Sequence, residues 1–129
     1  MHPILVVDDD SSIRGLIREI LEIEGYVTVE VTNGRDAVTA ARASRPGMII
    51  MDLRMPVMDG VTAIRMLRAD PATAPIPIIA LSAGLTLLAI ARTLPIEGLL
   101  SKPFELDDLV ALVRRHLEPD AIGAAPAAG

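Results

Sequence analysis

The sequence predicts an α/β fold, a doubly wound, five-stranded parallel sheet with helices on both faces. Short apolar segments alternate along the chain with segments whose apolar residues recur at helical spacing. This βαβαβαβαβα order demands a mostly parallel sheet, because parallel strands are joined by long crossover connections. The 129 residues, of which 51% are hydrophobic, are enough for one domain with its own core.

Five segments are predicted as strands. The first, third and fourth are apolar throughout, which is typical of strands buried on both faces. The second alternates Thr28 and Glu30 with β-branched residues, which favours an edge position. In chain order, the predicted strands are residues 4–7, 27–31, 48–51, 78–81 and 99–100.

Five further segments are predicted as helices. The first follows a stretch rich in capping residues, 8–12, and ends at Gly25. A turn is predicted at Asn33-Gly34, before the second helix. The last helix has acidic residues in its first turn and basic residues in its last, as the helix dipole favours. In chain order, the helical repeats cover residues 13–21, 36–43, 61–67, 85–94 and 106–117.

Composition and charge limit the functions to be considered. We predict one domain over residues 1–119 and a flexible tail over 120–129. The net charge of −5, with one tyrosine, one phenylalanine and no tryptophan, argues against direct binding of nucleic acid. Neither a charged leader nor an apolar run of bilayer length is present, so we expect a cytoplasmic protein without membrane contact. The absence of cysteine excludes disulfides and thiolate sites.

Polar residues follow four of the five predicted strands. They are Asp8 and Asp9 after the first strand, Asp52 after the third, Ser82 after the fourth and Lys102 after the fifth. Lys102 is the only lysine in a chain that otherwise uses arginine for its basic residues. In a parallel sheet these strand ends lie along one edge. If the first and third strands are neighbours, as in the strand order 2-1-3-4-5, the carboxylates meet at the topological switch point.

These residue types favour metal-assisted phosphoryl transfer. Three carboxylates in one crevice repel one another, and a divalent cation removes that repulsion. Oxygen donors without nearby histidine or cysteine favour Mg²⁺ or Mn²⁺ over zinc. A phosphoryl group held by the cation, the Lys102 ammonium and the Ser82 hydroxyl could be attacked by Asp52, which would form an acyl phosphate. His2 and His116 lie at a chain end and a helix end, so a Ser-His-Asp site has no support.

Four motifs carry a resemblance to a known family. They are Val6-Val7-Asp8-Asp9, the block from Asp52 to Gly60, Ile79-Ala80-Leu81-Ser82-Ala83 and Lys102-Pro103-Phe104. On these motifs, the chain from residue 4 to residue 117 resembles the receiver domain of response regulators. The resemblance implies a flavodoxin-like receiver fold and a role in two-component signalling. It also implies that Asp52 accepts a phosphoryl group from a phosphohistidine of a sensor histidine kinase or histidine phosphotransfer protein.

The resemblance also implies a role for each site residue. Asp9 and Asp52 would bind Mg²⁺ directly together with the backbone carbonyl of Arg54, and Asp8 would bind it mainly through water. Ser82 and Lys102 would contact the phosphoryl oxygens. The peptide bond between Lys102 and Pro103 is expected to be cis, as in the family.

Two places depart from the family's pattern. Leu99 stands where many members have the Tyr or Phe that swings inward on phosphorylation. Residues 85–96 carry a single charge, Arg92, where the corresponding helix of typical receivers carries several. This apolar segment is either a shortened element folded into the core or an interface. We expect a downstream protein, or a second copy in a homodimer, to bind through residues 85–117.

The sequence therefore predicts a stand-alone phosphorylation switch rather than a metabolic enzyme, one that catalyses its own phosphorylation and slow dephosphorylation. Arg54 and Gly84 flank the path of attacking water, and we expect both to affect the lifetime of the acyl phosphate. A haloacid dehalogenase-type phosphatase needs a second acid two residues after the nucleophile, where this chain has Arg54. The alternative is a degenerate receiver that acts as a phosphorylation-independent interaction or dimerisation module. The sequence leaves open whether the chain is naturally one domain or part of a larger protein.

Overall fold

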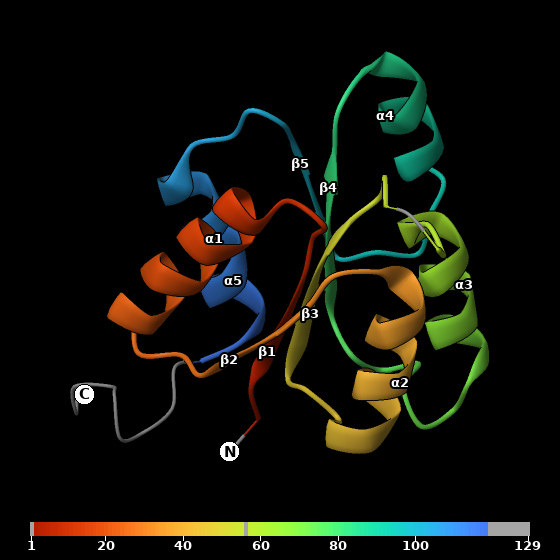
Figure 1. The fold of residues 1–129 in the computed structure, drawn as a ribbon, viewed down its shortest axis with the longest axis horizontal. Helices are drawn as coiled ribbons and strands as arrows, with labels where there is room; N and C mark the ends of the chain where they lie inside the picture. Colours follow the sequence, from red (N-terminus) through yellow and green to blue (C-terminus); the bar gives the residue numbers. More distant parts are fainter. Residues whose placement is uncertain (1, 56, 119–129) are drawn as a thin grey trace.

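The sheet of the computed structural model has the predicted topology. The structure describes residues 2–55 and 57–118, so the tail predicted over 120–129 lies outside the described residues. All strand pairs are parallel and their order is β2-β1-β3-β4-β5, which confirms the prediction (Figure 1). The strands are β1 (Ile4–Val7), β2 (Thr28–Val31), β3 (Met48–Asp52), β4 (Ile78–Ser82) and β5 (Gly98–Ser101).

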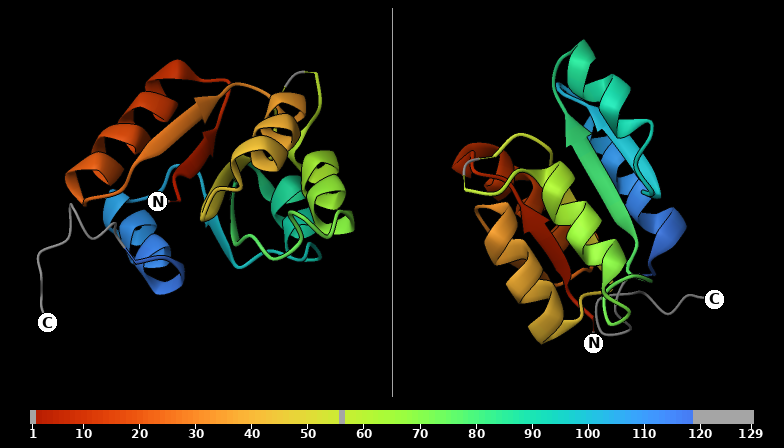
Figure 2. Two further views of the ribbon diagram at one scale, coloured as in Figure 1. Left: turned by 90° about the horizontal axis from the view of Figure 1, so that it is seen from below. Right: turned by 90° about the vertical axis from the view of Figure 1, so that its right-hand side faces the viewer.

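Helices cover both faces of this sheet. They are α1 (Ser11–Ile23), α2 (Gly34–Ser44), α3 (Gly60–Ala69), α4 (Leu85–Ala91) and α5 (Leu106–His116). The helices α1 and α5 lie on one face, and α2, α3 and α4 lie on the other (Figures 1 and 2). None of the helices in the described ranges is long and apolar enough to cross a membrane.

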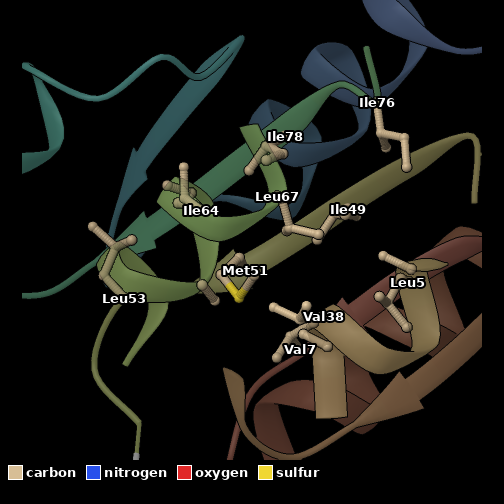
Figure 3. Packing of buried hydrophobic residues seen from close by; sticks show 14 of the residues in the cluster. Leu5, Val7, Val38, Ile49, Met51, Leu53, Ile64, Leu67, Ile76 and Ile78 are labelled. Carbon is tan, nitrogen blue, oxygen red and sulfur yellow. The ribbon is translucent and has the colours of Figure 1, made fainter. Parts of the chain in front are cut away.

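Two hydrophobic clusters fill the space between the sheet and its helices. Successive strand residues point to opposite faces of the sheet. Leu5 and Val7 therefore join the cluster beneath α2, α3 and α4, whereas Ile4 and Val6 join the cluster beneath α1 and α5. Figure 3 shows the first cluster, where Val38 of α2 lies against the side chains of the sheet. Every residue of β1, β3 and β4 is buried, whereas β2 is partly exposed, as the sequence predicts for an edge strand.

Side chains cap the first three helices at their N-termini. The carboxylate of Asp10 accepts hydrogen bonds from the backbone N–H groups of Ser12 and Ile13. The Asn33 side chain accepts one from Asp36 in the same way, so α2 begins at Gly34. The predicted turn at Asn33-Gly34 is thus wrong, because the residue types that make turns also cap helices. Because Asn33 is the N-cap, Gly34 is the first residue of the helix.

The apolar segment 85–96 belongs partly to the core. Leu94 is buried, and Leu87 and Ile96 pack against the cluster beneath α2, α3 and α4. Leu85 and Ile90 point outward, with exposed fractions of 83% and 37%. The helix ends at Ala91 rather than at residue 94, as residues 92–94 form tighter turns ahead of Pro95. The segment therefore has a core-facing side and an exposed apolar side.

Candidate functional site

The carboxyl edge of the sheet brings together the acidic residues predicted from the sequence. Carboxylate oxygens of Asp8, Asp9 and Asp52 lie within 4.8 Å of one another. Asp52 is the last residue of β3, and Asp8 directly follows the neighbouring strand β1. Asp8 is fully buried and Asp52 is 5% exposed, whereas Asp9 is exposed to solvent. Parallel pairing of β1 with β3 therefore creates an acidic site with one side open.

Lys102 bridges the two buried carboxylates. Its ammonium nitrogen Nζ lies 3.0 Å from Asp8 Oδ2 and 3.2 Å from Asp52 Oδ2. The Lys102 N–H donates to the carbonyl of Ser82 at 2.7 Å, which extends the pairing of β5 with β4 to this position. The bond from Lys102 to Pro103 is cis, as the resemblance implies. Strand pairing thus sets the position of the only lysine in the chain.

Further hydrogen bonds hold Asp8 in place. Its Oδ1 accepts the backbone N–H of Asp10 at 2.9 Å, and its carbonyl accepts the Arg14 guanidinium at 2.9 Å. Arg14 also pairs with Glu30 of β2 at 2.9 Å. Sequence reasoning missed Arg14, because nothing in the spacing indicates that this helix residue reaches back to the strand end. It connects α1 and β2 to the acidic site.

Charge and burial raise the pKa of the Asp52 carboxyl. Burial and the negative charge of Asp8 act in this direction, against the Lys102 ammonium and a hydrogen bond from the Arg54 N–H. Burial alone favours the neutral amine of Lys102, but its hydrogen bond to Asp8 and the charges of both acids outweigh burial and raise its pKa. Three carboxylates and one ammonium leave a formal charge of −2 at the site (−3 + 1). A divalent cation would balance this charge.

The donor set fits Mg²⁺ or Mn²⁺. All three side chains offer carboxylate oxygens, the ligand type that these hard cations take. The N–H of Arg54 donates to Asp52 Oδ1 at 3.3 Å, so the start of the loop after β3 lies beside the acidic site. Arg54 is exposed, and the contact that it makes with Asp52 comes from its backbone N–H.

Ser82 contributes a buried hydroxyl with an unused hydrogen-bonding capacity. It is the last residue of β4, one position beyond Leu81, which pairs with Asp52. Its Oγ is buried and has no hydrogen-bond partner among the described residues. Because buried hydroxyls are normally paired, such an atom beside a cluster of charged groups is suited to a ligand that brings its own oxygen.

An apolar cavity of about 380 Å³ opens beside Lys102. Its walls come from α1, from the segment that joins β5 to α5 and from the first residue of α5. They consist of Ile13, Leu16, Ile17, Lys102, Pro103, Phe104 and Leu106. Leu16 is half exposed, although it belongs to the apolar repeat at residues 13–21.

Leu99 lies on β5 and is partly buried against the cluster beneath α2, α3 and α4. Its side chain joins this core directly rather than lying on the surface. Strand β5 contains no aromatic residue, so no ring on this strand replaces the Tyr or Phe that many family members carry at the position of Leu99.

Comparisons of the sequence identify relatives in bacterial signalling. The family model of the response regulator receiver domain matches residues 4–114. The DNA-binding response regulator MtrA of Mycobacterium tuberculosis is 37% identical over 116 residues, which cover 88% of this chain and 50% of MtrA. The regulatory protein AtoC of Escherichia coli is 30% identical over 118 residues, which cover 92% of this chain and 26% of AtoC. The chain thus spans half or less of the length of these relatives.

Solved structures show the same architecture. A signal receiver domain of a histidine kinase from Syntrophus aciditrophicus superposes with a TM-score of 0.85 at 31% identity, covering 98% of this chain and 100% of that chain. The receiver domain of a sensor histidine kinase from Pseudomonas aeruginosa gives a TM-score of 0.81 at 33% identity, covering 89% and 96%, and holds a magnesium ion in its active-site cleft. Sequence and fold agree, and the chain belongs to the response regulator receiver domain family of two-component signalling.

Proposed function

We propose that the protein is a Mg²⁺-dependent phosphorylation switch in which Asp52 accepts a phosphoryl group. The observation that carries the proposal is the grouping of three carboxylates, one ammonium and one hydroxyl at a single sheet edge, and this hydroxyl has no partner in the part of the chain that the structure describes. Asp8, Asp9, Asp52 and the Arg54 carbonyl would hold the cation. When bound, the cation would neutralise the acids and the charge of the incoming phosphoryl group. The switch signals through its conformation rather than through a metabolic product.

The transfer step needs a nucleophile and two groups that bind phosphoryl oxygens. A carboxylate oxygen of Asp52 would form the new O–P bond, and the N–P bond of a phosphohistidine would break. The imidazole of the donor leaves with the electron pair of that bond and then takes a proton from solvent. The Lys102 ammonium and the Ser82 hydroxyl would donate to the phosphoryl oxygens, which gives the buried Ser82 Oγ its missing partner.

The apolar cavity beside Lys102 suits a phosphohistidine-bearing partner. Leu16 is 50% exposed at this cavity, and the cavity adjoins the residue that would bind the phosphoryl group. An amphipathic helix of a sensor kinase or phosphotransfer protein could place its apolar face there. Such docking would hold the phosphohistidine in line with Asp52.

The output surface is proposed to lie within residues 85–117. Leu85 and Ile90 leave apolar surface exposed on α4, which is suited to a downstream protein or a second copy of the chain. Size-exclusion chromatography with light scattering, with and without a phosphoryl mimic, tests the second option. A monomer in both states would contradict self-association.

The lifetime of the acyl phosphate is proposed to depend on Arg54 and Gly84. Gly84 has φ of 86° and ψ of 157°, a conformation that is essentially restricted to glycine, so Gly84→Glu would add backbone strain. Arg54→Asn changes an exposed side chain beside Asp52 and is the cleaner test. Equal dephosphorylation rates in the wild type and in Arg54→Asn would contradict this assignment.

Intact mass measurement after incubation with acetyl phosphate and Mg²⁺ tests the main proposal. We expect a single phosphoryl adduct that is lost in Asp52→Asn and in the absence of divalent cations. If neither acetyl phosphate nor a phosphohistidine donor produces an adduct on folded protein, the phosphorylation switch is ruled out. That result would favour a receiver-shaped interaction module, for which the exposed apolar side of α4 is the supporting observation.

A further inference from the structure

Gly34, the first residue of α2, makes a close backbone contact with the loop that follows β3. Its N–H donates to the carbonyl of Met58 at 3.0 Å. A Cβ atom at Gly34 would lie 2.3 Å from that carbonyl oxygen and 3.0 Å from the carbonyl oxygen of Asp59. Both neighbours are backbone atoms, so a larger residue at this position would have to displace the loop.

A second close contact joins the two ends of the same loop to each other, at Gly60 and at Asp52 and Leu53. The N–H of Gly60 donates to the carbonyl of Leu53 at 3.0 Å, and a Cβ at Gly60 would lie 2.4 Å from the carbonyl oxygen of Asp52. Between these ends the Met55 side chain is buried in the core. The described residues of the loop are therefore held by contacts on several sides.

Val57 indicates that this conformation is not the relaxed one. Its φ is 69°, in the left-handed region that β-branched residues rarely adopt. Its side chain is 69% exposed, so no burial of this side chain compensates for the strain. Strain of this kind persists where surrounding contacts determine the backbone. The contact with Gly34 is one of these constraints, and it is supplied by a separate helix.

We propose that Gly34 is a positioning residue for the cation site. Its backbone contact would hold in place the loop that carries the Arg54 carbonyl, which would be a ligand of the cation. The inference rests on the proposed function in one respect, the use of the Arg54 carbonyl as a ligand. The observed link is the hydrogen bond from the Arg54 N–H to Asp52 Oδ1, which already joins the loop to the acidic residues.

The test is the dissociation constant for Mg²⁺ of Gly34→Ala, measured from the shifts of backbone amide NMR signals during titration with MgCl₂. Groups that orient metal ligands typically change affinity by tenfold or more, so we expect binding to be roughly tenfold weaker than in the wild type. Alanine is a better helix former than glycine, so helix propensity alone would not weaken the protein. This readout needs no phosphorylation.

Two other glycine-to-alanine variants provide matched controls. A Cβ at Gly15 of α1 would have nothing within 4 Å. A Cβ at Gly47 would lie 3.0 Å from the Leu117 side chain, and the Gly47 N–H bonds to the carbonyl of Pro3, at the opposite edge of the sheet. Gly47→Ala therefore reports the effect of crowding away from the site. We expect both controls to bind Mg²⁺ with wild-type affinity.

A double variant covers the case in which Gly34→Ala does not fold. Val57→Gly removes the strained residue and lets the loop yield, so Gly34→Ala/Val57→Gly is expected to fold but to bind Mg²⁺ more weakly than Val57→Gly alone. If Gly34→Ala folds and its dissociation constant for Mg²⁺ is within twofold of the wild-type value, the proposal is overturned. If Gly34→Ala does not fold, the proposal is overturned when the double variant has a dissociation constant within twofold of that of Val57→Gly. Wild-type protein that binds Mg²⁺ but accepts no phosphoryl group would reject the proposed switch and leave this inference standing.

Discussion

At the scale of single residues, Asp52 is a carboxylate buried beside a second buried carboxylate, that of Asp8. Its raised pKa means that the ionised form is less stable in the folded protein than in the unfolded chain. The resulting loss of stability is complete above the folded pKa and absent below the unfolded value of about 3.9. We expect Asp52→Asn to raise the free energy of unfolding of the metal-free protein at neutral pH and to have little effect in acid.

Urea denaturation in EDTA at a series of pH values measures this difference. Lys102 keeps one carboxylate partner in the variant, because Asp8 Oδ2 remains 3.0 Å from its ammonium. Saturating Mg²⁺ should reverse the order, since a ligand at a hundred times its dissociation constant stabilises the folded protein by about 2.7 kcal/mol. A stability gain that stays constant from neutral pH into acid would show that charge is not its cause.

At the scale of elements, Arg68 of α3 ties together three segments of the chain. Its guanidinium donates to the carbonyls of Ala74 and Ile76 at 2.6 and 2.7 Å and to that of Pro95 at 2.8 Å. It also pairs with Glu97 at 2.7 Å, whose carboxylate accepts the N–H of the first residue of β4. We expect Arg68→Ala to lower the free energy of unfolding by about 1–3 kcal/mol, because carbonyls would lose their donor.

Thermal and urea unfolding of Arg68→Ala beside Arg65→Ala measures this contribution. Arg65 is exposed one turn earlier on the same helix, and changes at such surface positions are usually within about 0.5 kcal/mol. Equal losses in the two variants would contradict the role given to Arg68.

The apolar cavity beside Lys102 leads to a prediction about the rate of phosphoryl transfer. Leu16→Gln should slow phosphotransfer from a phosphohistidine protein by roughly tenfold, because it removes an apolar contact at the centre of the proposed interface. Phosphorylation by acetyl phosphate should proceed at the wild-type rate, since a small donor needs no groove. Ile23→Gln, on the same helix at 72% exposure but outside the cavity, is the control. Equal slowing with both donors would place the effect in the site itself.

The elements differ in how far the sequence predicts them. The buried strands followed from continuous apolar runs, and the position of Asp52 at a strand end followed with them. The strand order did not follow from these runs and was expected from the resemblance to the family. The start of α2 was missed because Asn33 serves turns and caps equally well. The contact between Gly34 and Met58 and the four partners of Arg68 depend on how separate elements pack. No periodicity within one segment contains that information.

At the scale of the whole molecule, the hydroxyl of Tyr26 joins distant parts of the chain. It donates to the carbonyl of Leu117 at 2.7 Å, which links the segment before β2 to the end of α5. We expect Tyr26→Phe to lower the free energy of unfolding by about 1 kcal/mol, the usual value of one such bond. The measured loss tests whether the hydrogen bond between Tyr26 and Leu117 stabilises the packing of α1 and α5 on this face of the sheet.

The pH dependence of this effect separates the hydrogen bond from packing. Burial raises the pKa of the Tyr26 phenol, so the folded protein keeps its proton at a pH where the unfolded chain has lost it. Ionisation of the unfolded chain therefore favours unfolding as the pH rises above about 10, in the wild type only. The stability difference between wild type and Tyr26→Phe, measured by urea denaturation, should shrink over that range. Lys102 titrates in both proteins, so its contribution cancels from the difference. If the difference in free energy of unfolding between the two proteins stays constant over this pH range, the destabilisation by Tyr26→Phe is due to packing instead.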